Sequence, residues 1–393
     1  MKRAKIVIGA NYGDEGKGLM TDYFCREAVS RGDACLSVCT NGGPQRGHTV
    51  VTPEGARHIF HHLGSGSFAG ADTYVSDAFL INPMIFREEY ERLREAGANV
   101  RVFVNPACRW TTPYDMILNQ MAEEFRGKRR HGSCGFGIWE TVLRYQNGTA
   151  ARPFGECDEK AVREVLIFMR DEYVPARLRE IGMPGIPEAW REILAGDAMI
   201  GHYIEDWRFF KDHTAEAEDD ILDRYDTAVF ENGQGLLLDM GRLEVLDHTT
   251  PSKTGLAEPA RILKGREADT EACYVTRTYL TRHGAGPMED ECEKAAINAD
   301  MIDRTNVPNP FQGTMRYGLL DTDALLGRIR EDFGGKLSGA ALSLAVTHVN
   351  ETGGCLAGSG EKREAVEALG RHFDRLYVSD GEERKSVRIS RGI

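Results

Sequence analysis

The chain has 393 residues and a formal charge of −12 at pH 7, from 49 lysines and arginines against 61 aspartates and glutamates. Hydrophobic residues make up 41% and charged residues 28%, a composition that excludes wholesale disorder, a coiled-coil rod and a collagen-like fibre. The acidic balance argues against a general nucleic-acid binder, and no apolar run approaches the ~18 residues that a membrane helix needs.

Strands and helices are predicted to alternate along the N-terminal part of the chain. A buried strand is expected over residues 4–10, a helix over 16–30 and a second strand over 34–40. The apolar run Ile6–Ile8 is short and is soon interrupted by charge, which indicates a strand rather than a signal peptide. The order strand, turn, helix, strand predicts an α/β fold with a largely parallel sheet.

The rest of the chain continues this pattern with a long helical interruption. Helices are expected over 83–96 and 116–126, a surface loop over 128–137, and strands over 100–104, 227–230, 272–280 and 340–349. We find no internal repeat and no low-complexity linker. Residues 1–393 are therefore predicted to form a single large α/β domain with a central mostly parallel sheet, interrupted by a helix-rich insertion at 150–224.

Nine cysteines are present, and none of them are spaced as CxxC. Scattered thiols without zinc-site spacing are typical of a reducing compartment. We expect a soluble, cytoplasmic protein.

A glycine-rich segment, Gly13–Gly18 (GDEGKG), lies between the first strand and the first helix. Glycines let backbone N–H groups approach phosphate oxygens, and a helix N-terminus adds partial positive charge. The segment is not a Walker A motif, because Asn11 and Gly18 occupy positions that need glycine and serine or threonine. The carboxylates of Asp14 and Glu15 would repel a polyphosphate unless Mg²⁺ intervenes or one of them does proton chemistry. The simpler alternative is a tight turn with a surface lysine.

Five motifs, in order, resemble those of the adenylosuccinate synthetase family. They are GANYGDEGKG, NGGPQRGHTVV, HGSCGFG, FENGQGLLLD and TRHGAGP. The family's counterparts are QWGDEGKG, GGxNAGHT, GTTGxGIG, FEGAQGxLLD and TRVGAGP. The resemblance covers about residues 4–145 and 225–325, and is weak over 150–224 and beyond about 350.

The resemblance implies a C–N ligase that depends on an NTP and Mg²⁺ and acts as a homodimer. Such an enzyme phosphorylates the 6-oxo group of IMP with GTP and then displaces the phosphate with the amine of aspartate. Its partners would be small molecules only: a purine nucleotide, an NTP and an amino acid.

The resemblance also implies roles for individual residues. Asp14 would be the base and a Mg²⁺ ligand, His48 the donor to the transferring phosphoryl group, and Gly47 a carbonyl ligand of the metal. The implied NTP-binding residues are Gly13, Glu15, Gly16, Lys17, Gly18, Gly47, Thr49 and Asn350. The implied residues of the nucleotide-substrate site are Gln45, Ser133, Cys134, Arg144, Gln234 and Thr249. Arg144 would reach across the dimer to the partner's phosphate.

One departure from the family concerns the amine substrate. Residues 311–321 (FQGTMRYGLLD) stand where the family carries an arginine cluster of the TTGRxRR type. The residues predicted for this loop are Gly313, Thr314 and Arg316. Only Arg316 keeps a guanidinium, and each lost charge-assisted bond should weaken aspartate binding by about an order of magnitude or more. Either Arg282 or Arg46 compensates, or the amine is not aspartate.

A second departure concerns the base of the NTP. Asn350 stands where the family has an aspartate that accepts two hydrogens from guanine. An asparagine side chain has one acceptor and one donor group and can pair with adenine instead, so ATP is predicted to compete with or replace GTP. A viral branch that makes a diaminopurine nucleotide also departs from strict GTP use, but tends to lose the catalytic aspartate that this chain keeps.

Two alternatives to adenylosuccinate synthesis stay open at this point. A divergent paralogue would use ATP with a different amino acid or a different oxo-purine nucleotide. A catalytically silent, nucleotide-binding regulator is disfavoured, because a mere binder has no need of the base Asp14 or the phosphoryl donor His48.

Overall fold

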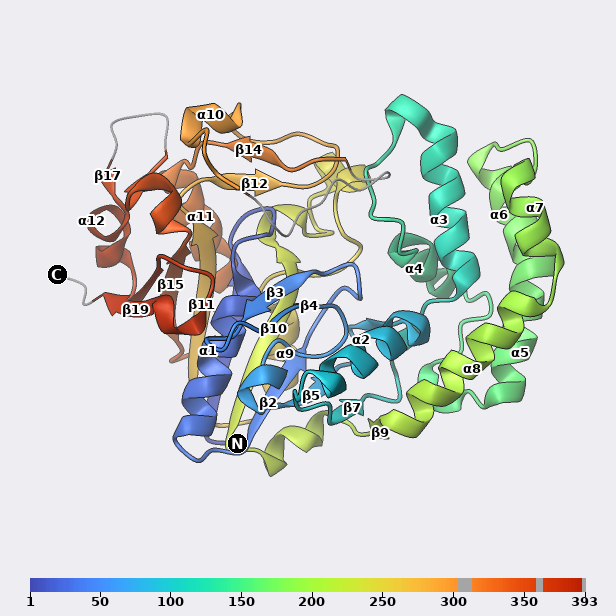
Figure 1. Ribbon diagram of the computed structural model, residues 1–393, viewed down its shortest axis with the longest axis horizontal. Helices are drawn as coiled ribbons and strands as arrows, with labels where there is room; N and C mark the ends of the chain where they lie inside the picture. Colours follow the sequence, from blue (N-terminus) through green and yellow to red (C-terminus); the bar gives the residue numbers. More distant parts are fainter. Residues whose placement is uncertain (303–312, 358–362, 391–393) are drawn as a thin grey trace.

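The computed structural model describes residues 1–302, 313–357 and 363–390. Its largest sheet has ten strands in the order β19-β18-β15-β11-β1-β10-β2-β5-β7-β9 (Figure 1). These strands are β1 (Arg3–Gly9), β2 (Cys35–Cys39), β5 (Asp72–Val75), β7 (Val102–Val104), β9 (Ala215–Glu216), β10 (Thr227–Gly235), β11 (Asp269–Arg277), β15 (Ala341–Thr347), β18 (Arg375–Ser379) and β19 (Val387–Ser390). Neighbouring strands are parallel except β18 and β19, which confirms the predicted fold class.

Alternate residues of each strand point to opposite sides of this sheet, and the side chains on both sides are buried in hydrophobic cores. On β1, Val7 packs in the core that lies against α1 (Lys17–Ser30). Ile6 and Ile8 pack in a second core with residues of α9 (Ala257–Leu263) and α11 (Thr322–Phe333). The central strands therefore lie between two helical layers and read as continuous apolar runs.

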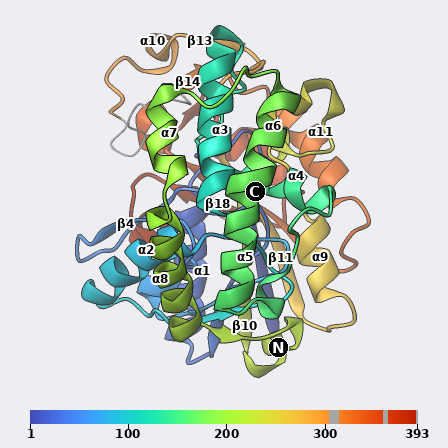
Figure 2. The ribbon, with the colours of Figure 1, turned by 90° about the vertical axis from the view of Figure 1, so that its right-hand side faces the viewer.

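A third core joins the β7 end of the sheet to a block of helices. These helices are α2 (Pro83–Glu95), α3 (Pro113–Arg126), α4 (Ile138–Gln146), α5 (Glu159–Phe168), α6 (Val174–Ile181), α7 (Glu188–Ala195) and α8 (Ala198–His213). Most of them stack along one side of the molecule, and Figure 2 looks onto that side. α3 begins three residues earlier than predicted, because Thr112 and Asp115 form a capping box ahead of it.

Smaller elements gather beyond the carboxyl ends of the parallel strands. They are the hairpin β3 (His48–Val51) and β4 (Arg57–Phe60), the three-stranded sheet of β12 (Leu280–Arg282), β14 (Arg316–Gly318) and β13 (Glu291–Cys292), and the short helix α10 (Lys294–Ile297). Two-stranded pairs are formed by β6 (Leu80–Ile81) with β8 (Arg109–Trp110) and by β16 (Cys355–Leu356) with β17 (Arg363–Glu364), and α12 (Ala365–Leu369) follows β17. In Figure 1, β12, β14 and α10 lie above the carboxyl edge of the sheet.

Two predicted strands differ in extent from the observed ones. The strand expected over 227–230 continues to Gly235, so Gln234 lies at the end of β10 rather than in a separate turn. A register shift between Val7 and Gly9 of β1 allows Gly235, at the end of β10, to pair with Gly9. The strand expected over 272–280 ends at Arg277, and Leu280 opens a different sheet.

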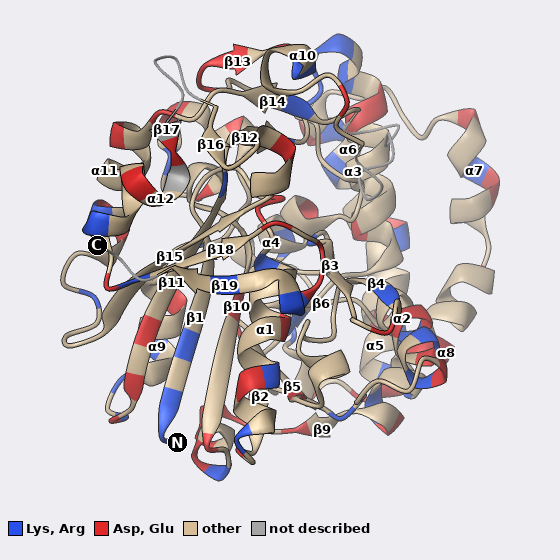
Figure 3. Ribbon diagram, turned by 60° about the vertical axis from the view of Figure 1, so that its left-hand side comes forward, with Lys and Arg blue, Asp and Glu red and all other residues tan. Residues whose placement is uncertain are grey.

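Charged side chains are concentrated on the outer helices and loops, and the central strands are mostly uncharged (Figure 3). None of the helices in the described part of the chain combines the length and the apolar character that a membrane crossing requires. The few charged residues inside the sheet include the buried Glu231 on β10 and Glu271 on β11.

Candidate active site

A cavity of about 580 Å³ opens where β1, β10, β11 and β15 end. Ligands of open α/β proteins bind at this edge, beyond the carboxyl ends of the parallel strands. The predicted site residues that line the cavity are Gly13, Asp14, Glu15, Gly16, Lys17, Gly18, Gln45, Gly47, His48, Thr49, Ser133, Cys134, Gln234, Thr249 and Asn350. Segments as far apart in the chain as Gly13 and Asn350 are thus brought to one place.

Buried polar atoms without a hydrogen-bond partner are concentrated around this cavity. Among the described residues they include Glu15 Oε2, both amide atoms of Gln45, Thr49 Oγ1, Arg282 Nε and His283 Nδ1, all from residues that line it. Buried polar atoms in folded proteins are normally paired. Their concentration here indicates a polar ligand that pairs with them.

The turn after β1 has a backbone suited to an anion. Gly13, Asp14 and Gly16 have positive φ angles of 108°, 56° and 91°. Aspartate is among the few non-glycine residues that adopt this conformation at modest cost. α1 begins at Lys17 without a side-chain cap, so the N–H groups of its first turn remain open to the cavity at the positive end of the helix dipole. Such an N-terminus binds phosphate.

Glu15 is much less of an obstacle to a polyphosphate than its sequence position suggests. Burial raises the pKa of Glu15 to about 7, and the charge of Lys17 opposes that shift. The main-chain and side-chain N–H groups of Asn11 both donate to Glu15 Oε1, at 2.7 Å. A carboxyl group that is partly protonated near neutral pH repels a phosphate weakly, and Lys17, only 3% exposed, still supplies a full positive charge.

Asp14 is held by its backbone and keeps its carboxylate in the cavity. Its main-chain oxygen accepts a hydrogen bond from Arg277 Nε at 2.5 Å. The neighbouring carbonyl of Gly13 accepts from the Thr281 hydroxyl at 3.1 Å. Asp14 Oδ2 lies 3.4 Å from His283 Nε2, and the Asp14 side chain remains 25% exposed. A carboxylate held in this way can accept a proton from a ligand without moving the turn.

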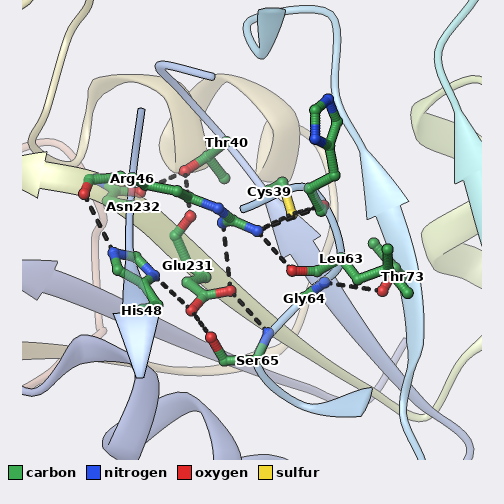
Figure 4. A network of polar contacts seen from close by, with 12 residues as sticks. Cys39, Thr40, Arg46, His48, Leu63, Gly64, Ser65, Thr73, Glu231 and Asn232 are labelled. Atoms are coloured by element: carbon green, nitrogen blue, oxygen red, sulfur yellow. Dashed lines mark hydrogen bonds and ion pairs between the residues drawn. The ribbon is translucent and has the colours of Figure 1, made fainter. Parts of the chain in front are cut away.

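His48 is the end of a buried network that Figure 4 shows from close by. Its Nδ1 lies 2.7 Å from Glu231 Oε1, and its Nε2 lies 3.1 Å from the carbonyl oxygen of Gly233. Glu231 is on β10 and is fully buried. Both partners of His48 can only accept hydrogen bonds when Glu231 is ionised, so each ring nitrogen acts as a donor when both bonds are made.

The protonation of this pair follows from opposing effects. Burial raises the pKa of Glu231, but the positive charges of Arg46 and His48 outweigh it and bring the pKa down to about 2. Burial lowers the pKa of His48, and the Glu231 carboxylate opposes that shift. Glu231 is therefore an anion throughout the physiological range and accepts from Nδ1–H of His48, whereas Nε2 carries a hydrogen for the Gly233 carbonyl only while the ring is protonated.

The predicted nucleotide-substrate residues, with the exception of Arg144, line the cavity. The amides of Gln45 and Gln234 pack over Gly42, where a Cβ would lie 3.0 Å from Gln45 Nε2 and 2.8 Å from Gln234 Oε1. Ser133 exchanges hydrogen bonds with Asn119 of α3, at 2.8 Å and 3.2 Å. Burial raises the pKa of the Cys134 thiol to about 11, so this residue is a neutral thiol where the family has a hydroxyl.

Arg144 does not line the cavity of its own chain. It is fully buried on α4 and makes a two-pronged ion pair with Asp115 of α3, at 3.1 Å for both bonds. Its Nη1 and Nη2 also donate to the carbonyl oxygens of Ala150 and Trp110. These bonds join α3 to α4, and the contact with a partner's phosphate stays a prediction.

The three residues predicted for the amine loop do not line the cavity, although Tyr317 of the same segment does. Arg316 pairs with Glu291 (2.7 Å) and donates to the carbonyl oxygens of Gly284 and Gly286 at 3.1 Å and 2.8 Å. Gly313 and Thr314 precede it and also do not line the cavity, whereas Phe311 and Gln312 of the predicted loop lie outside the described residues.

The two cations proposed as substitutes differ. Both line the cavity, but Arg46 is buried with its guanidinium bonded to groups of this chain, whereas Arg282 Nε has no partner among the described residues. Arg282 also donates to the carbonyl oxygens of Pro287, His248 and Ala285.

Asn350, the residue predicted to contact the base of the NTP, lines the cavity. Asn350 lies in a short 3₁₀ turn directly after β15, with its side chain exposed at the cavity. His348 precedes that turn in a left-handed conformation and accepts or donates one bond with Thr347 Oγ1 at 2.8 Å. Gly381 and Glu382, from the loop after β18, also line the cavity.

Several residues of the site were not predicted from the sequence. Glu231 was inside a matched motif, FENGQG, but only its glutamine received a role. Ser65 and Asn119 lie in no matched motif, and their contact with the site depends on folding. His283 lies in the matched motif TRHGAGP, where the family has valine, and that difference was the one available signal.

Two oxygen groups near Lys17, on Asp14 and Gly47, are candidate ligands of Mg²⁺. In nucleotide sites this ion is usually held by one or two carboxylates together with the substrate's phosphates. The carboxylate of Asp14 and the carbonyl group of Gly47 line the cavity beside the N-terminus of α1. In the part of the chain that the structure describes, no group of three or more His, Cys, Asp or Glu residues could hold a metal by itself. The residues therefore fit an ion that binds together with nucleotide phosphates.

Comparison with known proteins identifies related sequences. The family model described as adenylosuccinate synthetase matches residues 6–325. The adenylosuccinate synthetase of Streptomyces griseus is 27% identical over 292 residues, and that of Clostridium botulinum (strain Eklund 17B / Type B) is 29% identical over 301 residues. Each match covers 73% of this chain and 65% of the relative, so the chain matches about two thirds of the length of these proteins.

Two solved structures share the fold over nearly the whole chain. The fully ligated adenylosuccinate synthetase of Plasmodium falciparum superposes with a TM-score of 0.72 at 13% identity, covering 98% of this chain and 99% of that one. The succinoaminodeoxyadenylate synthetase of cyanophage S-2L, bound to dGMP and to dATP as an energy donor, superposes with a TM-score of 0.60 at 16% identity. That match covers 99% of this chain and 95% of the phage protein.

Proposed function

The chain belongs to the adenylosuccinate synthetase family, and from that premise we propose that it is a ligase that uses an NTP and Mg²⁺ to join aspartate to C6 of IMP. The observation that carries the proposal is the meeting, in one cavity, of a positioned carboxylate, a histidine backed by a buried anion, and an uncapped helix N-terminus with a lysine. These are Asp14, His48 with Glu231, and α1 with Lys17.

The first step is phosphorylation of the base oxygen. Asp14 takes the proton from N1 of the purine, and the electron pair of that N–H bond moves through the ring so that negative charge collects on O6. O6 attacks the terminal phosphorus of the NTP, the bond to the bridging oxygen breaks, and NDP leaves. Asp14 suits this role because its backbone is fixed by Arg277 while its carboxylate stays in the cavity.

His48 and Lys17 stabilise the phosphoryl group during transfer. In the unliganded protein His48 Nε2 faces the carbonyl oxygen of Gly233 at 3.1 Å. A phosphoryl oxygen that replaces this carbonyl receives the Nε2–H bond, and the buried Glu231 anion stabilises the positive charge on the ring. A bound Mg²⁺ ion, held by Asp14 and the Gly47 carbonyl with the phosphates, would neutralise part of the phosphate charge.

The second step exchanges phosphate for the amine. The amino group of aspartate attacks C6, the C6–O bond breaks and inorganic phosphate leaves, with the surplus amine proton lost to solvent or phosphate. Arg282 lines the cavity, and its Nε has no partner among the described residues, so we assign it to a carboxylate of aspartate. Arg316, which is engaged with Glu291, is not assigned to the substrate.

A product assay tests this function. Protein, Mg²⁺, IMP and an equimolar mixture of amino acids are incubated with ATP or GTP, and the products are identified by mass spectrometry. We expect a mass equal to IMP plus aspartate minus water, and a drop of about 100-fold or more in its rate for Asp14→Asn and for His48→Asn. His202→Asn, an exposed histidine on α8, is the matched control and should keep full activity.

Other outcomes of this assay are equally informative. Full turnover in both site variants would refute the assigned mechanism. An adduct with a different amino acid would refute aspartate as the amine, and phosphate release without an amine would indicate a simple NTPase.

We further propose that ATP is the preferred phosphate donor. Asn350 lies at the base end of the cavity, and its amide offers one acceptor and one donor, which matches adenine and not the two donors of guanine. The phage protein of the same fold, which is bound to dATP as an energy donor, shows that the fold accepts an adenine nucleotide. Asn350→Asp should shift the ratio of kcat/KM for ATP and GTP toward GTP by about tenfold. A wild-type protein that uses GTP as well as ATP would contradict this assignment.

A further inference from the structure

We propose that Arg46 is a positioning residue for His48: it holds Glu231 and the loop that carries His48 in their working arrangement before any ligand binds. This inference rests on the proposed function for what His48 does, but its structural part can be tested independently. Arg46 stands where the family's GGxNAGHT segment has alanine, so the device is a feature of this chain.

Arg46 is one of the largest fully buried side chains of the molecule. Its Nη1 lies 3.3 Å from Glu231 Oε2, and its Nη2 donates to Cys39 Sγ at 3.1 Å and to the carbonyl oxygen of Leu63 at 2.7 Å. Its Nε donates to the carbonyl oxygen of His61 at 2.8 Å. A single guanidinium thus ties together the end of β2, the middle of β10 and the segment that follows β4 (Figure 4).

Glu231 has both oxygens engaged as a result. Oε1 accepts from His48 Nδ1 and from the Ser65 hydroxyl, and Oε2 accepts from Arg46 and from the Ser65 N–H group at 3.1 Å. The bond from Arg46 fixes the carboxylate plane, and that plane fixes the direction of the His48 ring. If Arg46 were absent, Oε2 would keep only the Ser65 N–H group, and the carboxylate could rotate toward it.

The loop before His48 is tied from the other side as well. His61 Nδ1 lies 2.8 Å from the carbonyl oxygen of Pro44 and 2.6 Å from that of Arg46. Arg46 bonds the main chain of His61, and His61 bonds the main chain of Arg46. This reciprocal pair fixes residues 44–46, which lead directly into Gly47 and His48.

The structure supplies a matched control. Glu271, on β11, which lies on the other side of β1 from β10, is also a buried carboxylate that accepts from a serine hydroxyl and from an arginine, Arg375. Arg375 does not line the cavity. The test compares Arg46→Ala and Arg46→Lys with Arg375→Ala and Arg375→Lys in the full chain.

Two readouts are made on each variant. The first is the Nδ1–H resonance of His48 in ¹⁵N-histidine-labelled protein, assigned by its loss in His48→Asn. The second is kcat and KM for each substrate. For Arg46→Ala we expect a shifted or broadened resonance and a kcat that falls by about 10- to 100-fold, with KM values that change by less than about threefold. Arg46→Lys, which keeps the charge, should recover part of both, and the Arg375 variants should leave both unchanged.

Each outcome decides the inference. An unchanged resonance and an unchanged kcat in folded Arg46→Ala overturn it. An equal loss of kcat in Arg375→Ala also overturns it, because the effect would then be general destabilisation. If Arg46→Ala does not fold, Arg46→Lys decides by the same two readouts. If the wild type has no ligase activity but the resonance depends on Arg46, the proposed function fails and the positioning of His48 stands.

Discussion

Glu231 and Glu271 are two buried carboxylates with nearly the same surroundings and different consequences. Each points to the face of the sheet that α1 covers, and each accepts from a serine hydroxyl and an arginine. Glu231 adds His48, whereas Glu271 adds Lys5 at 2.6 Å and the Tyr377 hydroxyl at 2.8 Å. The network of Glu231 reaches the cavity through His48, whereas the hydrogen-bond partners of Glu271 do not line the cavity.

The difference comes from register. Both strands pair with β1, where Glu271 lies opposite Lys5 and Glu231 lies opposite Val7. A step of two residues along a strand is about 6.6 Å, which brings Glu231 that much closer to the carboxyl edge where the loops carry function. A buried charge in this sheet therefore stabilises the fold or serves the site according to its height along the strand.

The strongest test of this comparison removes each charge in turn. Glu231→Gln should lower kcat by about 100-fold, because His48 loses the anion that orients it, whereas Glu271→Gln should leave kcat within about threefold of the wild type. Both variants should unfold more readily, since each leaves cations that paired with the carboxylate uncompensated. The measurement is kcat beside the free energy of unfolding. Equal effects on kcat would mean that register does not separate the two roles.

The fold and the glycine-rich loop could be predicted because their signals are local. Residues 16–30 carry their helical spacing within fifteen positions, and the observed α1 spans Lys17–Ser30. The GDEGKG segment lies between a strand and a helix and lines the cavity, as its letters and position indicated, and phosphate binding there stays a prediction.

The support of the site could not be predicted because its contacts are distant in the chain. Glu231 is 166 residues from Ser65 and 185 from Arg46, and no periodicity links such pairs. The direction of Arg144 could not be predicted for a related reason: it is decided by Asp115 on another helix, which a comparison of motifs does not include. Motifs indicated which residues line the cavity, and only the folded structure showed which residues hold them in place.

A second test uses acid. The pKa of Glu231 is lowered to about 2 and that of Glu271 is also lowered, so each ionised carboxylate stabilises the folded state at neutral pH. That stability is present above the unfolded pKa of ~4.5 and is lost as the pH falls through the folded value. For Glu231 the shift corresponds to about 3 kcal/mol.

The two carboxylates should differ in how much of the acid sensitivity they carry. Glu271 pairs with Arg375, which is 46% exposed, and solvent screens that pair, whereas the Glu231 network is fully buried. Urea unfolding between pH 5 and pH 2 should therefore show a flatter pH dependence in Glu231→Gln than in Glu271→Gln. A larger change in Glu271→Gln would show that the outer network dominates acid stability.

The smallest expected effects are those of the two serines. Ser65 and Ser343 each donate a hydroxyl hydrogen to their glutamate, and the alanine variants remove one charge-assisted bond worth about 1.5–3 kcal/mol. Both variants should lose similar stability, so stability alone does not distinguish them. Ser65→Ala should also lower kcat by a few-fold, because the Ser65 hydroxyl shares Glu231 Oε1 with His48, whereas Ser343→Ala should leave kcat unchanged. If kcat does not change in Ser65→Ala while stability falls, then Arg46 alone is sufficient to hold the carboxylate, and the serine belongs to the fold in both networks.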